Sequence, residues 1–264
     1  MKKILVAGAA LATLIGTPAF AADLALKAPP PPAPVASWNS CYIGVNGGYG
    51  WGTGDPQLRP SSDPTSQAFW NPAFAAGAAP SSFSYTSTGG LAGAQIGCNR
   101  QFGTIVAGVE ADLDWAHISG SQNINTAGVP GFVPGFFSSG QTLDWLGTFR
   151  GRVGVTPTAQ WLLYVTGGLA YGKVSDNLSF AFPTSLDFHS ITTSNTSAGW
   201  TAGVGAEWMF THNWSFKVEY LYVDLGSHSF ASTPAGRAAN LATTLTETFQ
   251  DKYNIVRGGL NLHF

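Results

Sequence analysis

The chain ends in Ile255-Val-Arg-Gly-Gly-Leu-Asn-Leu-His-Phe264, and this stretch decides the fold. Side chains of a β-strand alternate between two faces. Here one face is apolar and ends on an aromatic residue, and the other carries Arg257, Asn261 and His263. A soluble sheet ending this way would expose an unprotected edge. In a closed membrane barrel the last strand pairs with the first, so we expect this stretch to pair with Trp38 to Trp51.

The amino-terminal region predicts export. Met1-Lys-Lys is basic, an apolar run follows from Ile4 to Ile15, and Ala19 and Ala21 form an A-x-A pattern. These features predict a signal peptide over residues 1–21, cleaved after Ala21. The apolar run is too short for a membrane anchor, because about 30 Å of hydrocarbon must be crossed. A Pro-rich periplasmic linker is expected over residues 22–37, and a barrel domain over 38–264.

Composition favours a barrel that crosses a membrane with strands. Charged residues make up 10% of the chain, aromatic residues 13%, and there are 33 glycines. No segment after the signal peptide has the 18 consecutive apolar residues of a transmembrane helix. The net charge of −2 argues against nucleic acid as a partner.

Eight segments alternate between apolar and small or polar residues, and each is long enough to cross a membrane as a tilted strand of roughly nine to eleven residues. They run over Trp38–Trp51, Leu91–Phe102, Ile105–Ile118, Gln141–Val155, Trp161–Lys173, Ser197–Phe210, Trp214–Leu225 and Ile255–Phe264. Short turns fall around Gly103, Pro157 and His212. Long loops are expected at 52–90, 119–140, 176–196 and 226–250. This alternation predicts an all-β, eight-stranded, antiparallel, up-and-down transmembrane β-barrel with long extracellular loops and both termini in the periplasm.

The tryptophans predict the membrane boundaries, because aromatic rings gather at both interfaces. The four expected at the inner interface are Trp38, Trp161, Trp208 and Trp214. The four expected at the outer interface are Trp51, Trp115, Trp145 and Trp200. Only Trp70 falls in a loop. A soluble barrel would have to place these large rings inside an eight-stranded interior that barely holds side chains, so we favour the membrane.

The inward-facing parity carries charges that would cost about 2–4 kcal/mol each if they faced lipid at the midplane. We expect an interior network that contains Glu110, Asp112, Asp114, Asp144, Arg150, Arg152, Glu207, Lys217, Glu219 and Arg257. Neighbouring strands place Glu110 and Asp112 within reach of Arg150 or Arg152. Arg257 is the expected partner of Glu219. Such a network can line a gated pore or plug the lumen with salt bridges; the small lumen favours the plug.

Cys41 and Cys98, the two cysteines, fall on outward parity near the same end of paired strands. A cross-strand disulfide suits an oxidising periplasm if the Cα atoms lie within about 7 Å. Two free, lipid-facing thiols are the alternative.

No cofactor, metal or catalytic site is predicted. The five histidines are scattered without ligand spacing. No catalytic motif is present, so we expect no enzyme. His228-Ser229 is the single, weak hint of a lipid-acyl hydrolase. The aromatic residues of the first long loop, Phe69, Trp70, Phe74 and Phe83, suggest either a binding surface or a flexible loop.

A family resemblance rests on motifs that recur in order. These are Ser40-Cys-Tyr-Ile-Gly-Val-Asn-Gly-Gly-Tyr-Gly-Trp51, Gly93-Ala-Gln-Ile-Gly-Cys-Asn-Arg-Gln-Phe102, Val109-Glu-Ala-Asp112, Gly151-Arg-Val-Gly154, Leu163-Tyr-Val-Thr-Gly-Gly-Leu-Ala-Tyr171, Lys217-Val-Glu-Tyr-Leu-Tyr-Val-Asp-Leu225 and the terminal strand. Over residues 38–264 the chain resembles the small opacity-type porins, the outer-membrane immunogenic proteins of alphaproteobacteria.

The resemblance implies an eight-stranded barrel of the OmpA transmembrane type in the outer membrane of a Gram-negative bacterium. It implies a surface antigen that supports envelope integrity, with haem binding or adhesion in some relatives, and it makes Phe264 part of the signal read by the barrel-assembly machinery. The loops match no binding motif.

We therefore expect a monomeric structural protein with a plugged lumen, in contact with outer-membrane lipid and lipopolysaccharide. A narrow porin for small solutes, or a loop-borne haem or host-ligand site, is the alternative.

Overall fold

The computed structural model describes residues 37–182, 187–232, 234–236 and 243–264. The expected signal peptide and all of the linker but Ser37 lie outside the described residues. Among those described, no helix is long and apolar enough to cross a membrane.

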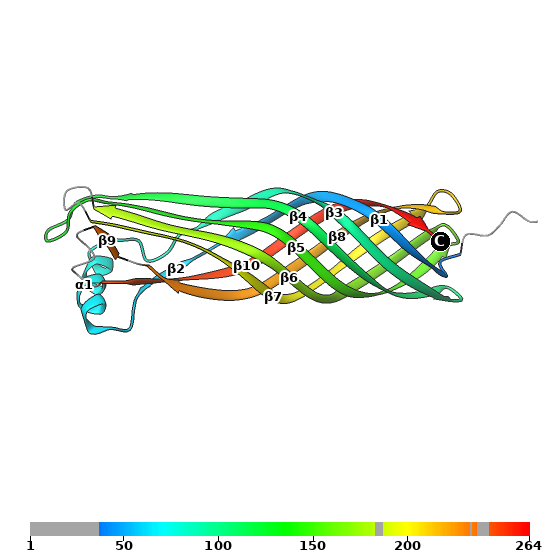
Figure 1. Cartoon of the computed structure of the whole chain (residues 1–264), viewed down its shortest axis with the longest axis horizontal. Helices are drawn as coiled ribbons and strands as arrows, with labels where there is room; N and C mark the ends of the chain where they lie inside the picture. The colour runs from blue at the N-terminus through cyan, green and yellow to red at the C-terminus, as the bar shows by residue number, and fades with distance from the viewer. Residues whose placement is uncertain (1–36, 183–186, 233, 237–242) are drawn as a thin grey trace, which may run out of the picture. The chain divides into compact units, whose positions relative to one another are not determined.

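Eight long antiparallel strands form a closed ring (Figure 1). They are β1 (Ser40–Gly54), β3 (Tyr85–Phe102), β4 (Ile105–Thr126), β5 (Gly135–Thr158), β6 (Trp161–Phe182), β7 (Asp187–Met209), β8 (Trp214–Ala231) and β10 (Leu245–His263). β10 closes the ring on β1, from Tyr42 opposite His263 to Trp51 opposite Asn254. The pairing expected for the terminal strand is therefore confirmed.

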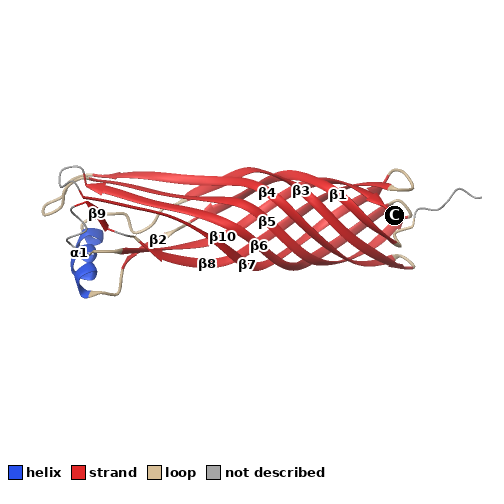
Figure 2. Ribbon diagram, in the orientation of Figure 1, coloured by secondary structure: helices blue, strands red, loops and turns tan. Residues whose placement is uncertain are grey.

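The two ends of the barrel differ. At the turn end, tight connections follow β3, β5 and β7, and the left-handed Gly103 (φ +63°) forms one of these turns. At the capped end, the chain between β1 and β3 forms the short strand β2 (Gln57–Pro60) and the helix α1 (Pro64–Ala75). The short strand β9 (Pro234–Gly236) lies beside β7 (Figure 2).

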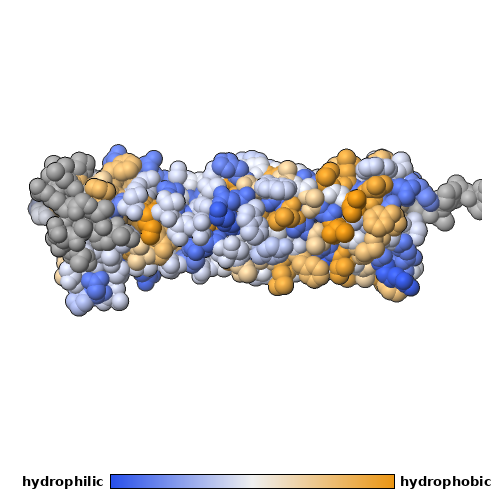
Figure 3. All heavy atoms as spheres, in the orientation of Figure 1, coloured by the Kyte–Doolittle hydropathy of each residue, from blue (hydrophilic) through white to orange (hydrophobic). Residues whose placement is uncertain are grey.

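The strands continue well beyond the expected boundaries. β4 runs on to Thr126 and β5 begins at Gly135, so much of the sequence expected as loop is strand. Exposed residues of these extensions are Ser121, Asn123 and Asn125, which lack the apolar alternation that marks a membrane strand. The outer surface accordingly changes from apolar near the turn end to polar toward the capped end (Figure 3).

α1 begins where the side chain of Asp63 accepts a hydrogen bond of 2.7 Å from the amide of Ser66, as N-cap residues do. Its Trp70 is buried and packs edge-on against Phe180 of β6. Trp70, Phe74 and Phe83, expected in a loop, thus form part of an apolar cap over the barrel mouth, whereas Phe69 is more exposed.

Candidate functional site

The interior of the barrel is filled in layers, whose order follows from residue positions along the strands. An apolar layer near the turn end contains Trp38, Val106, Leu162, Tyr164 and Met209. An ion-pair network follows. A middle apolar layer contains Leu91, Ile118, Leu143, Leu146, Ala170, Val174, Leu221, Val223, Leu225, Tyr253 and Ile255. Beyond it lie a polar chamber and then the apolar cap.

The ion-pair network is centred on two buried arginines. Arg150 forms ion pairs with Asp112 and Glu219, both at 2.9 Å, and with Glu110. Arg257 reaches Asp114 at 2.7 Å, Asp112 at 2.9 Å and Glu219 at 2.8 Å. The guanidinium groups therefore tie together acids from β4 and β8.

Lys217 and Arg152 complete the network. The ammonium group of Lys217 lies 2.7 Å from Glu110, on the opposite side of the ring. Arg152 pairs with Glu207 at 3.0 Å, and its guanidinium carbon lies 4.9 Å from the ring centre of Tyr42. Every acid and base of the network is buried, so each charge depends on its partners rather than on water.

Nine of the ten charged residues predicted to face inward lie in the network. The structure brings together Glu110, Asp112, Asp114, Arg150, Arg152, Glu207, Lys217, Glu219 and Arg257. Arg257 bonds Glu219 through Nε at 2.9 Å. Asp144 was expected inside and is not: a β-bulge between Leu143 and Trp145 shifts it outward, where it lies 3.5 Å from Lys173.

Small inward residues make room for these long side chains. A β-carbon at Gly48 would collide with the backbone and β-carbon of Arg257, and one at Gly93 would collide with Asp114. The glycine-rich parity of β1 and β3 is therefore the space that the network occupies.

The outer face carries two belts of exposed aromatic side chains. Trp161, Trp208 and Trp214 lie near the turn end, and Trp51, Trp115 and Trp200 lie at the other boundary. Trp145, less exposed, packs edge-on against Tyr171 at the same level. Trp38 was expected in the inner belt, but it is fully buried; its indole donates to the carbonyl of Ala159 at 3.1 Å and it closes the turn end from inside.

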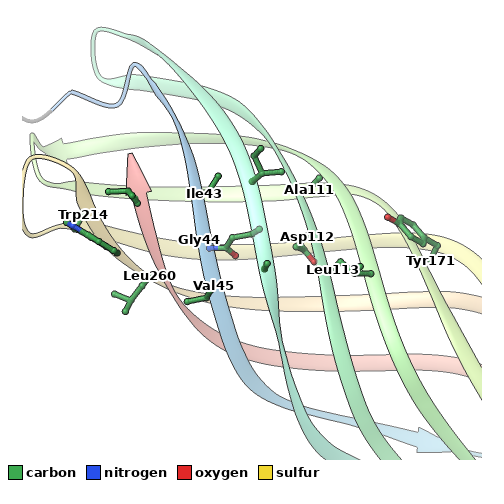
Figure 4. Close-up of a pocket in the computed structure, with 13 residues that line it drawn as sticks. Ile43, Gly44, Val45, Ala111, Asp112, Leu113, Tyr171, Trp214 and Leu260 are labelled. Atoms are coloured by element: carbon green, nitrogen blue, oxygen red, sulfur yellow. The ribbon is translucent and has the colours of Figure 1, made fainter. Parts of the chain in front are cut away.

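Between these belts the outward side chains form an apolar groove of about 620 Å³ (Figure 4). Ile43 and Val45 of β1 and Leu260 of β10 line it, and Trp214 and Tyr171 flank it. It suits hydrocarbon chains and offers almost no polar group to a solute.

Cys41 and Cys98 are directly opposite each other and form a disulfide, with an S–S distance of 2.08 Å. Phe264, 71% exposed, lies at the turn end, where its amide donates to the carbonyl of Cys41 at 3.0 Å. The start of β1 and the end of β10 are thereby held together.

The polar chamber was not expected, because His228, Asp176 and Glu247 fall in segments assigned to loops. His228 of β8 lies between two carboxylates: its Nε2 is 2.6 Å from Asp176 of β6, and its Nδ1 is 3.0 Å from Asp251 of β10. The amide group of Gln141 donates to both aspartates, at 3.2 and 2.6 Å. Parity counted beyond the outer tryptophans would have pointed to these positions.

The chamber lies beyond the outer tryptophan belt and therefore outside the membrane-spanning segments. The two carboxylates raise the pKa of His228 to about 10, so this imidazole stays charged at neutral pH. Burial raises the pKa of Glu247 to about 8. Ser139 donates to Oε1 of Glu247 at 2.7 Å, whereas Oε2 has no hydrogen-bond partner among the described residues.

His228 and Ser229 do not form a catalytic pair. The histidine is held by the two aspartates, and the hydroxyl of Ser229 bonds the hydroxyl of Thr248 at 2.8 Å on the outer face. Adjacent residues of a strand point to opposite faces, so this hydroxyl cannot reach the imidazole.

The model of the outer membrane protein beta-barrel domain matches residues 7–264. The chain belongs to this family. It lies in the outer membrane of a Gram-negative bacterium, with the turn end in the periplasm and the capped end outside.

Relatives match all or most of the chain. The 31 kDa outer-membrane immunogenic protein of Brucella melitensis is 33% identical, with 100% of each chain covered. The 25 kDa outer-membrane immunogenic protein of Brucella abortus is 30% identical, with 87% of each covered.

Solved barrels are more distant. The outer membrane protein OprG of Pseudomonas aeruginosa is 13% identical with a TM-score of 0.47, covering 87% of this chain and 99% of its own. The outer membrane protease OmpT of Escherichia coli is 9% identical with a TM-score of 0.48, covering 86% and 98%.

Proposed function

We propose that this protein is a closed, non-conducting barrel with a structural role in the envelope, which holds a capped surface antigen above the outer membrane. The observation that carries the proposal is the stack of layers inside the barrel. A hydrated ion would have to cross two apolar layers and displace a buried ion-pair network between them.

The network supports a plug rather than a pore. Lys217 of β8 forms an ion pair with Glu110 of β4, and Arg150 of β5 forms one with Glu219 of β8. Side chains that meet across the lumen leave no file of water along the axis, as is usual in eight-stranded barrels filled by side chains. Opening a path would break several ion pairs at once.

Conductance in planar lipid bilayers tests the proposal. The purified, folded protein should produce no steady channels under a potassium chloride gradient. A matched variant with Arg150→Ala and Lys217→Ala removes two cross-lumen side chains and is the positive control for insertion. Steady openings of the unaltered protein that persist across the gradient would instead establish the narrow porin.

The same proposal includes contacts with membrane lipid and with the barrel-assembly machinery. The apolar groove and aromatic belts support contact with outer-membrane lipid and lipopolysaccharide, and the exposed Phe264 supports recognition by the barrel-assembly machinery. We propose a monomer without enzymatic activity, exported by a signal peptide over residues 1–21. No described residue favours haem or a host ligand over this structural role.

A further inference from the structure

The wall of the barrel is open between β7 and β8 above the outer tryptophan belt. β7 and β8 pair from Met209 opposite Ser215 to Trp200 opposite Asp224. Beyond that level, and within the part of the chain that the structure describes, residues 190–199 of β7 pair with β6 only, and Ser227–Ala231 of β8 pair with β10 only. β7 next gains a neighbour on this side at His189, which faces Pro234 of β9.

Side-chain burial reveals the same opening. Asn195 of β7 and Val174 of β6 are direct partners and face the same interior, yet Val174 is fully buried and Asn195 is exposed. Thr193 is likewise half-buried, whereas its partner Asp176 is buried. Solvent therefore reaches the inner face of β7 from the side where β8 is missing.

No described residue pairs with the β7 edge at residues 190–199 on the side of β8. The segment Ser190-Ile-Thr-Thr-Ser-Asn-Thr-Ser-Ala-Gly199 contains no proline and no charged residue, the features that usually block pairing at an exposed edge. A ten-residue edge of this kind presents a row of backbone donors and acceptors. Addition of an extended strand is a common way for proteins to recognise a peptide at such an edge.

The opening leads to the polar chamber. His228, on the β8 side, is 15% exposed in its side chain and binds Asp176 and Asp251. Oε2 of Glu247, a fully buried residue near Asp176, has no hydrogen-bond partner among the described residues. Among the described residues, Asp176 and Asp251 share one cation, His228, and the buried oxygen of Glu247 has room for a further donor or cationic group.

We propose that the opening between β7 and β8 is a docking site for an extended peptide strand of another protein. The strand would pair with the free edge of β7 and direct a lysine or arginine side chain inward to Asp176, Asp251 and Glu247. Main-chain hydrogen bonds supply sequence-independent affinity, and the acidic chamber selects the basic side chain. The site is separate from the plugged membrane half and does not depend on whether the lumen conducts.

The test uses the full-length protein in detergent micelles and a fluorescent ten-residue peptide of alternating threonine and lysine. Fluorescence anisotropy should show saturable binding. A peptide in which proline replaces each threonine keeps the charge and cannot pair as a strand, so it should not bind. A peptide with glutamate in place of lysine should also not bind. Spermidine distinguishes binding of the cation alone: full competition by it would show that strand pairing contributes nothing.

Two sets of variants localise the binding. Joining Ser194→Cys to Ser229→Cys with a short bis-maleimide bridges the opening on its outer face and should weaken binding by at least about tenfold. Joining Asn177→Cys to Thr192→Cys bridges the closed β6–β7 ladder and should change nothing; the native cysteines are bonded to each other. Asp251→Asn should weaken binding by about tenfold, and the surface variant Asp144→Asn should not.

Gel mobility before and after heating verifies that each variant is folded. Equal binding by the proline peptide, unchanged binding after the opening is bridged, or no anisotropy change at millimolar peptide would each overturn the proposal.

Discussion

Below the level of Trp200, β7 has a strand of the wall on both sides, whereas above it residues 190–199 pair with β6 alone among the described residues. The interiors differ in the same way. In the membrane half, four cations face five carboxylates in a closed network in which Arg150 contacts three acids and Arg257 contacts four. Among the described residues of the outer half, His228 is the cation between Asp176 and Asp251, and β7 and β8 do not pair there. Among the described residues, the closed region places four cations against five carboxylates, whereas the open region places one cation, His228, against Asp176 and Asp251.

The largest expected effect is in the membrane half. Arg257→Met should lower the free energy of unfolding by about 3–5 kcal/mol, because Asp112, Asp114 and Glu219 would remain buried without their shared partner. Urea unfolding in micelles, followed by tryptophan fluorescence, measures this. Arg100→Met, on the exposed outer face, is the matched control and should be near neutral. Equal free energies of unfolding for the two variants would mean that the network does not stabilise the barrel.

The cap should unfold independently of the membrane half. Trp70→Ala removes a buried ring that packs on Phe180 and should destabilise the cap by about 3 kcal/mol. Hydrogen–deuterium exchange should rise in peptides from α1 and β2, and stay unchanged in peptides that contain Arg150. Phe69→Ala, at a more exposed ring of the same helix, is the control. Faster exchange around Arg150 in the Trp70 variant would show that the two halves unfold as one unit.

Removing the cation of the chamber should have a smaller effect. His228→Gln keeps hydrogen-bonding ability and leaves Asp176 and Asp251 facing each other, so we expect a loss of about 1–2 kcal/mol confined to the outer half. His212→Gln, in an exposed turn, is the control. The same exchange experiment measures both, and a loss as large as that of Arg257→Met would contradict the contrast between the halves.

The smallest expected effect is the pH dependence of stability in the outer half. The raised pKa of about 10 for His228 means that folding favours its protonated form, so its contribution is complete below its ordinary pKa of 6.5 and is lost as pH rises toward 10. Glu247, with a pKa raised from 4.5 to about 8, also holds its proton more tightly when folded. Protection of the outer half, corrected for intrinsic exchange rates, should therefore fall between about pH 5 and pH 9. Protection that rises over this pH range would contradict the expectation.

The sequence predicts the membrane half well, because lipid imposes a strict apolar face and charges must then face inward. Parity alone identifies the network residues. It misplaces Asp144, because the bulge beside Trp145 shifts the alternation, and Trp38, because a tryptophan just before a strand can fold into the barrel mouth.

The alternation of apolar and polar residues does not predict the outer half. In Ser190 to Ser197 both faces meet water, so hydroxyl and amide residues occur on both parities and no period of two remains. The chamber around His228 and the cap helix around Trp70 therefore lie in segments that read as loops. Cross-lumen partners such as Lys217 and Glu110 depend on the narrowness of the barrel, which alternation does not encode.

The contrast between a sealed membrane half and an open outer half can be measured on one strand. Asn195 and Thr201 both face inward on β7, one above and one below the level at which pairing with β8 ends, and Thr201 is 1% exposed. Single variants Asn195→Cys and Thr201→Cys, in protein reconstituted in lipid vesicles, can be labelled with a membrane-impermeant charged methanethiosulfonate. We predict rapid labelling at position 195 and none at 201. Rapid labelling at both positions, or protection at both, would contradict the contrast between a sealed membrane half and an open outer half.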